Sequence, residues 1–320
     1  MSSSSRSPEN ALAELLWSHW TELGVSGWRL QPSARAVDVT IDPEPLIIIT
    51  AALADVEPRL RDEATDWCVT FGRYVSKVRL KNLLKLPFGQ APGYDDFAAT
   101  VNRAAHLGWP QRRGRARPFK PTGRSRLDVR GKPSVIRLRA RVVFGVSARA
   151  EILVLLAANQ EWGYTAAELA ERARYGRRGV VEALDALMLA GLVRQVDAPT
   201  ARRYALADPV AIDGVLGRPP AHDIDWGVAF DACWNALRTL RAFGDSSATI
   251  RAIEAAKAAE HISGQLTRIG MVPPGPVPSG LKAGQLFGAW VMDLLRLLAR
   301  PGQDESAPRR ARSHARRRAG

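Results

Sequence analysis

The chain has 320 residues, which is enough for two or three domains with buried cores. Hydrophobic residues make up 46% and charged residues 24% of it, the proportions of an ordinary globular protein. The net charge of +14 is unusual and unevenly placed: residues 111–141 hold twelve basic residues and one acid, and residues 300–320 hold seven arginines and two acids. Basic charge gathered in two tracts suits segments that lie on a polyanion.

Several classes of protein are excluded by what the sequence lacks. The two cysteines, Cys68 and Cys233, are far apart, so there is no disulfide framework and no cysteine metal site. The longest apolar runs, residues 46–49 and 152–158, are too short to span a bilayer, and the first residues lack the apolar stretch of a secretion signal. We therefore expect a cytoplasmic protein that binds no membrane.

Catalytic and cofactor motifs are also missing. The five histidines show no metal-ligand spacing, and the chain has no P-loop, no dinucleotide-binding glycine motif after a strand and no nucleophile elbow. The carboxylates of Glu151, Glu168 and Glu171 are interpreted as solvated helix faces. The sequence predicts no enzyme, no cofactor and no metal.

Residues 1–110 predict an N-terminal helical domain behind a polar lead. Helical spacing and capping residues predict helices over residues 10–23, 43–53, 58–71, 76–86 and 95–107, with a short strand at 37–41. Asn10 is the predicted cap of the first helix. Residues 43–86 can form a helix-turn-helix, or a plain bundle with a solvated basic face. In either case Val78 is expected to face inward, and the exposed charges are expected to be Lys77, Arg79, Lys81 and Lys85.

The segment 111–133 predicts a basic flexible linker. It is rich in Arg, Gly and Pro and has only two large apolar residues before Val129, so it cannot bury enough surface to fold alone. We interpret it as an arginine-rich arm that contacts phosphates and that also serves as a solvated linker; the two roles are compatible. The residues predicted to contact phosphates are Arg112, Arg113, Arg115, Arg117, Lys120, Arg124 and Arg126. Trp109, just before it, could stack on a nucleic-acid base.

Residues 134–217 predict a compact unit of helices followed by a β-hairpin. The first helix covers 134–144, with Val135, Leu138, Val142 and Val143 expected to face inward. A second helix carries Ile152, Leu155 and Leu156 at helical spacing. Thr165, with Glu168 three residues later, predicts a capping box at the start of the third helix. A fourth helix begins near Arg177 and ends before Gly191, and two short strands follow at 192–194 and 203–206.

Three short motifs carry a resemblance to a known family. They are ELA at 168–170, VVEAL at 180–184 and AGLV at 190–193. The segment containing them, about 60 residues, is similar to bacterial winged helix-turn-helix transcriptional regulators of the MarR and ArsR kind. The resemblance implies that the helix beginning at Arg177 enters the DNA major groove and that the hairpin is a wing. The residues it assigns to DNA binding are Arg177, Arg178, Val181, Glu182, Arg194, Arg202 and Arg203.

Two acidic residues depart from what DNA binding favours. Glu182 and Asp185 lie on the exposed side of the predicted recognition helix, where carboxylates are repelled by phosphates. A glutamate can accept a hydrogen bond from cytosine N4, so Glu182 can also be a base contact. The alternative is that this unit binds a protein partner instead.

Residues 218–300 predict a C-terminal helical domain, and residues 301–320 a disordered basic tail. Helices are expected over 225–243, 248–269 and 281–299, with apolar stripes that fit either a dimer interface or a self-contained core; Leu286 belongs to one of these stripes. The predicted fold is mainly α, with a central winged helix-turn-helix. We expect a transcriptional regulator that binds double-stranded DNA as a homodimer. The alternative is a protein-interaction module, and the layout also resembles, more weakly, antitoxin regulators of nucleotidyltransferase toxin systems.

Overall fold

The computed structural model describes residues 7–26, 39–196, 201–220, 223–244 and 246–300. This part of the chain is mainly α-helical and contains one two-stranded antiparallel sheet, formed by β1 (Val193–Val196) and β2 (Arg203–Leu206). The prediction of a mainly α fold with a small β-hairpin is therefore confirmed. None of the helices in these ranges is long and apolar enough to cross a membrane.

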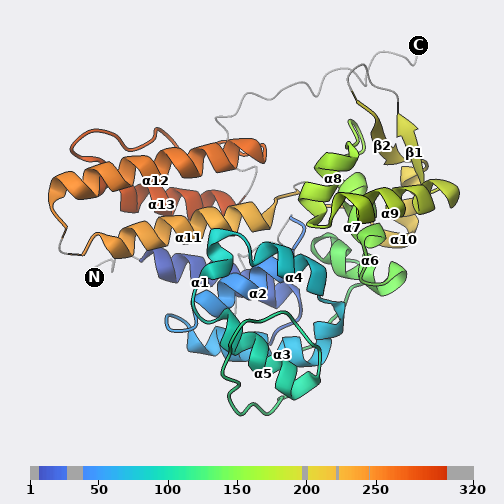
Figure 1. Cartoon of the computed structure of the whole chain (residues 1–320), viewed down its shortest axis with the longest axis horizontal. Helices are drawn as coiled ribbons and strands as arrows, with labels where there is room; N and C mark the ends of the chain where they lie inside the picture. The colour runs from blue at the N-terminus through green and yellow to red at the C-terminus, as the bar shows by residue number, and fades with distance from the viewer. Residues whose placement is uncertain (1–6, 27–38, 197–200, 221–222, 245, 301–320) are drawn as a thin grey trace.

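The larger of two hydrophobic cores is shared by helices from the N-terminal and the C-terminal parts of the described chain. Its helices are α1 (Pro8–Glu22), α2 (Pro43–Ala52), α3 (Pro58–Phe71), α4 (Lys77–Leu83), α5 (Tyr94–Ala105), α11 (Trp226–Ala242), α12 (Ala248–Arg268) and α13 (Ala283–Ala299). Within this core α13 packs on α1 and α11 packs on α2 (Figure 1). The Trp226 indole N–H, for example, donates to the Thr40 carbonyl at 2.7 Å. We call these eight helices the body. The separate N-terminal and C-terminal domains predicted for 1–110 and 218–300 are corrected accordingly, because their apolar faces cover each other.

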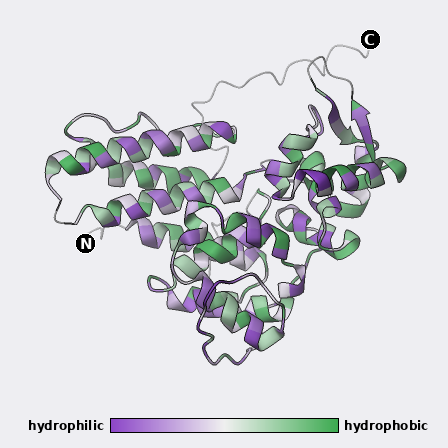
Figure 2. Cartoon of the chain, in the orientation of Figure 1, coloured by the Kyte–Doolittle hydropathy of each residue, from purple (hydrophilic) through white to green (hydrophobic). Residues whose placement is uncertain are grey.

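The smaller core belongs to residues 136–216, which we call the hairpin unit. It contains α6 (Ile136–Phe144), α7 (Ala148–Ala158), α8 (Ala166–Ala173), α9 (Arg177–Leu189), the hairpin and α10 (Pro209–Leu216). In sequence it is inserted between the two halves of the body, and in Figure 1 it lies beside the body as a distinct lobe. Hydrophilic and hydrophobic residues alternate around its helices (Figure 2), as expected for helices with one buried face.

Local signals set several helix ends as the sequence predicts. The Thr165 hydroxyl accepts the Glu168 N–H at 3.2 Å, and the Glu168 carboxylate accepts the Thr165 N–H at 2.7 Å, which confirms the capping box. Ser76 caps α4. The predicted cap Asn10 is wrong, because Ser7 caps α1 one turn earlier. Of the predicted strand, residues 37–38 lie outside the described residues, and residues 39–41 are not part of the sheet.

Several residues expected to face inward are exposed. Val78, Val142 and Val143 are 46%, 46% and 50% exposed, and Leu286 is 52% exposed. Two arginines next to these valines in sequence, Arg79 and Arg141, are buried instead, and they are described below. Trp109 is buried, which leaves it unavailable for stacking on a base; the exposed tryptophan among the described residues is Trp162, at 70%.

Candidate nucleic-acid interface

The outer face of α9 is open. Arg177 and Arg178 lie at its first turn, and both are exposed. Val181 is 39% exposed, whereas Val180, Ala183, Leu184 and Leu187 are buried against the rest of the hairpin unit. The helix therefore has one packed face and one free face. The predicted contact residues on α9 lie together on the free one.

The charge on that face is mixed. Arg178 pairs with Glu182 one turn later, with 2.8 Å between the guanidinium Nε and the carboxylate Oε1. Both side chains are exposed, so the pair adds only a few tenths of a kcal/mol to stability. Asp185 is exposed further along the helix. Basic character is thus concentrated at the N-terminal turn of α9, where the helix dipole is also positive.

The hairpin presents two of its three predicted arginines. Arg194 and Arg202 are exposed. Arg203 is half-buried, because its guanidinium donates to the Trp162 carbonyl at 3.0 Å and lies 3.4 Å from the Glu168 carboxylate. It therefore fastens the hairpin to the start of α8, and of the three predicted hairpin arginines it is the one that is not fully exposed. The predicted tip, 197–200, lies outside the described residues.

The turn between α8 and α9 is held by α4 of the body. The Arg79 guanidinium donates to the Ala173 carbonyl, and the Asn82 amide donates to the Arg174 carbonyl, both at 2.8 Å. The Ser76 hydroxyl and the Tyr175 phenol are 2.9 Å apart. Carbonyls at the end of a helix lack partners within the helix, so these donors fix the end of α8 and hence the start of α9. The sequence gives no signal for this contact, because its partners are about 90 residues apart.

A buried ion cluster lies where the two cores meet. It consists of three carboxylates and three guanidiniums: Asp42, Glu44, Arg79, Arg137, Arg141 and Glu151. Arg141 donates to Glu44 at 2.7 and 2.9 Å and to Glu151 at 2.8 Å, and Arg79 donates to Glu44 at 2.9 Å. Arg79 also contacts Asp42, and Arg137 contacts Glu151. The six residues come from both cores, so the cluster joins the hairpin unit to the body.

The cluster corrects two expectations. Arg79 is not a surface charge and Glu151 is not on a solvated helix face, since both are buried with at most 1% of the residue exposed. Burial alone would raise the pKa of the Glu151 carboxyl, but Arg141 and the two other guanidiniums lower it to about 2. Burial opposes the charge on Arg79 as well, yet the surrounding carboxylates, Asp42 first, raise its pKa well above the usual value. Glu151 and Arg79 are therefore both held in their charged forms by their partners in the cluster.

Residues 111–132, which we call the strap, run along the surface of the body. Carboxylates on α5 accept two strap backbone N–H groups, that of Arg112 on Asp95 at 3.0 Å and that of Arg115 on Asp96 at 2.7 Å. Further along, Asp66 accepts the Thr122 N–H, and the Gly24 carbonyl accepts the Arg126 N–H at 2.9 Å. The prediction of a flexible linker is corrected by these contacts. The strap has no core of its own, but acidic residues of the body bind its backbone.

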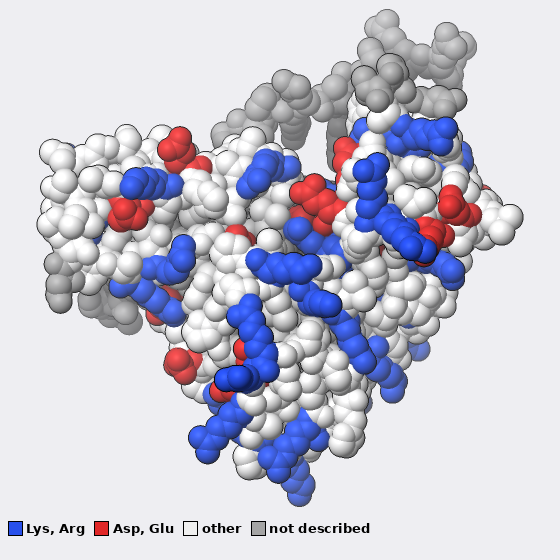
Figure 3. Space-filling model, in the orientation of Figure 1, with Lys and Arg blue, Asp and Glu red and all other residues white. Residues whose placement is uncertain are grey.

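Most of the basic side chains of the strap are exposed. Exposed side chains are Arg112, Arg113, Arg115, Lys120, Arg124 and Arg126, whereas Arg117 is half-buried and pairs with Asp62 at 2.6 Å. Figure 3 shows Lys and Arg gathered over the region of α4 and the strap, while basic and acidic side chains lie side by side over α9. On the face shown in Figure 3, basic side chains without acidic neighbours therefore gather on the body rather than on the predicted recognition helix.

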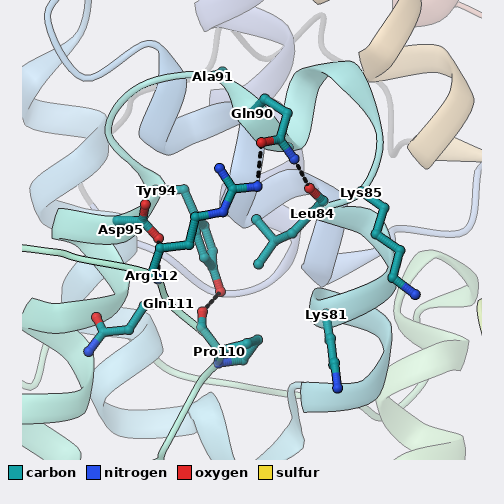
Figure 4. A pocket seen from close by; sticks show the side chains of 11 residues that line it. Lys81, Leu84, Lys85, Gln90, Ala91, Tyr94, Asp95, Pro110, Gln111 and Arg112 are labelled. Atoms are coloured by element: carbon teal, nitrogen blue, oxygen red, sulfur yellow. Dashed lines mark hydrogen bonds between the residues drawn. The ribbon is translucent and has the colours of Figure 1, made fainter.

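A groove opens between α4 and the beginning of the strap. Its volume is about 270 Å³, and Lys81 and Lys85 line one side while Arg112 lines the other (Figure 4). The Arg112 guanidinium donates to the Gln90 side chain, and the Tyr94 hydroxyl donates to the Pro110 carbonyl at 3.0 Å. These contacts hold the strap side of the groove in place.

Within the described residues no group of His, Cys, Asp and Glu is arranged to hold a metal ion. Cys68 and Cys233 are buried thiols whose pKa values are raised by burial, Cys233 to about 12. They are therefore unreactive core residues. No known protein family, curated protein or solved structure matches the chain.

Proposed function

We propose that this chain is a DNA-binding transcriptional regulator whose hairpin unit docks on double-stranded DNA through α9. The order of α7, α8, α9 and an antiparallel hairpin is the order of a winged helix. In that arrangement the last helix enters the major groove, which is wide enough to admit an α-helix. The observation that carries the proposal is the open outer face of α9, with Arg177, Arg178 and Val181 exposed on it.

Each exposed group on α9 has a chemical use in a major groove. Arg177 and Arg178 can each donate two hydrogen bonds to the O6 and N7 atoms of a guanine. Glu182, oriented by Arg178, can accept from the N4 amino group of a cytosine. Val181 lies between them and can contact a thymine methyl group. On the hairpin, Arg194 and Arg202 are exposed and can contact phosphates, which position the protein without reading sequence.

The clamp from α4 supports the same function. A recognition helix must keep a fixed orientation, because base contacts tolerate little displacement. The bonds from Arg79 and Asn82 to the end of α8 fix the turn that leads into α9. We place the protein on DNA as a homodimer that binds a two-fold site, with half-sites about 34–36 Å apart. Light scattering of the complex on a two-fold site would measure its stoichiometry.

The test is a change in sequence preference. DNA selected from a random pool by the full chain would be measured against unselected DNA by fluorescence anisotropy. Arg177→Ala with Arg178→Ala should lose roughly 1–3 kcal/mol per base contact and relax the preference at those positions. The matched control is Arg268→Ala with Arg296→Ala, which removes two exposed arginines from α12 and α13. If both double variants retain the full preference, α9 does not read the DNA.

A protein partner is the second candidate function, in the form of an interaction or antitoxin-like module. Leu189 at the end of α9 is 91% exposed and Trp162 is 70% exposed, and large exposed apolar side chains are typical of protein-binding surfaces. This reading requires that the full chain show no sequence preference for DNA and that Trp162→Ala and Leu189→Ala abolish binding of a protein that copurifies with it. Retained partner binding by both variants would exclude it.

A further inference from the structure

The groove between α4 and the strap is lined by basic side chains, and the sequence segments that form it contain few acidic residues. Residues 67–94 and residues 97–127 contain no aspartate or glutamate. On α4 the exposed cations are Lys77 and Lys81, one turn apart, and Lys85 follows the helix on the same side. Asp95 also lines the groove, but its carboxylate accepts the Arg112 backbone N–H at 3.0 Å. Three cationic side chains therefore face a hollow that one carboxylate, Asp95, balances only in part.

We propose that this groove is a second binding site for the sugar–phosphate backbone of the duplex that α9 contacts. Lys81, Lys85 and Arg112 supply the cations, and they contact phosphates without reading bases. The inference rests on the proposed DNA-binding function and adds a second, sequence-independent surface to it. The chain then covers a longer stretch of DNA than the hairpin unit alone could reach.

The groove and α9 are held in a fixed relation by α4. Lys81 lies between two residues of α4, Arg79 and Asn82, that donate to the end of α8 just before α9 begins. The buried ion cluster adds a second rigid connection, because Arg79 bonds to the body through Glu44 and lies 3.3 Å from Glu151 of the hairpin unit. The lysines of α4 therefore lie at a set distance from α9, so a duplex that spans both surfaces meets them without any rearrangement of the backbone. Preorganisation of the backbone in this way reduces the ordering cost of binding.

The chemistry fits a polymer better than a small phosphorylated molecule. The cationic surface does not end at the groove, since Arg113 and Arg115 continue it along the strap and Lys77 continues it along α4. The strap backbone is fixed there by Asp95 and Asp96, so only the arginine side chains, and not the segment that carries them, have to be ordered on binding. A phosphodiester chain can use the whole row, whereas a nucleotide can use only part of it.

The experiment measures how DNA affinity depends on salt and on duplex length. The test variant is Lys81→Ala, Lys85→Ala and Arg112→Ala in the full chain, and the control is Lys257→Ala, Arg268→Ala and Arg296→Ala, which removes the same charge from α12 and α13. Loss of three phosphate contacts should reduce the slope of log K against log salt by about 2.7, whereas the control should leave the slope close to that of the unchanged protein. The unchanged protein should also bind better as the duplex is lengthened, and the test variant should gain much less. Lys81→Arg, Lys85→Arg and Arg112→Lys should retain the slope.

A charge-neutral variant gives an independent measurement. A Cβ atom on Gly114 would lie 1.9 Å from the Asp95 carbonyl oxygen, so Gly114→Ala must move the strap away from α5 without changing any charge. We expect it to weaken DNA binding several-fold, with a reduced salt slope and an unchanged sequence preference.

Two outcomes would overturn the proposal. One is a salt slope of the test variant equal to that of the control. The other is that the unchanged protein binds ATP or inorganic pyrophosphate, as measured by calorimetry, and that the test variant loses this binding while it still binds the duplex. That result would make the groove a site for small phosphorylated molecules. The two proposals fail separately. If only the groove variant loses affinity and the Arg177 and Arg178 variant behaves like its control, the groove stands and reading by α9 does not.

Discussion

Replacing Glu151 by glutamine tests whether the buried ion cluster holds the two cores together. The substitution keeps the shape of the side chain but removes one of three negative charges, which leaves three guanidiniums facing two carboxylates. Glu151 contacts Arg137 and accepts from Arg141 at 2.8 Å, and it is fully buried. Breaking a buried ion pair by removing one partner costs about 3–5 kcal/mol. That is a large part of the stability of about 5–15 kcal/mol that is usual for a folded protein.

The assay is urea unfolding followed by tryptophan fluorescence at pH 7, with Glu182→Gln as the control. Glu182 makes a similar bond to Arg178, but both partners are exposed, so its loss should cost no more than about 0.5 kcal/mol. A second variant, Arg137→Met with Glu151→Met, removes one charge of each sign and should cost less than Glu151→Gln alone. If Glu151→Gln and Glu182→Gln cost the same, the cluster does not contribute as the structure indicates.

Three further predictions concern single residues. Burial against Trp226 and Phe230 lowers the pKa of His19 from its usual 6.5 to about 3, so the folded state keeps the imidazole neutral. Only the unfolded state takes up a proton as the pH falls below 6.5, so the free energy of unfolding should decrease by about 2 kcal/mol between pH 7 and pH 5. Urea unfolding at the two pH values measures this decrease, which His19→Phe should abolish. Gly163→Ala should unfold or displace the hairpin, because a Cβ there would lie 2.3 Å from the Tyr204 carbonyl oxygen. A Cβ on Gly191 meets open space, so Gly191→Ala should cost only about 1 kcal/mol for its left-handed backbone conformation. Equal shifts in melting temperature for the two variants would contradict the predicted clash at Gly163. Asn82→Ala leaves the Arg174 carbonyl without its amide donor, so it should lower the free energy of unfolding by about 1 kcal/mol. It should also weaken binding to the selected DNA. Unchanged DNA affinity would show that the bond from Asn82 does not position α9.

The local elements of this protein could be predicted from the sequence. Short-range rules fix where a helix begins: Thr165 with Glu168 opens α8, and Ser76 opens α4, because the bonding partners lie within four residues of each other. The same rules place α9 and its exposed face, since apolar residues recur at helical spacing. That spacing puts Arg177, Arg178 and Val181 on the exposed face, whereas their assignment as candidate contact residues came from the resemblance to winged helix-turn-helix regulators.

What the tertiary structure decided is which charges are at the surface and which regions share a core. Helical spacing cannot show that Arg79, Arg141 and Glu151 are buried, because a charged residue is expected outside unless a partner far away in the chain neutralises it. Nor can it show that α11 packs on α2, or that carboxylates of α5 bind the backbone of the strap. Each of these depends on pairs separated by tens to hundreds of residues. The sequence alone therefore determined most of the helices and the hairpin, whereas long-range burial and ion pairing determined their arrangement and left a positive surface on the body over α4 and the strap.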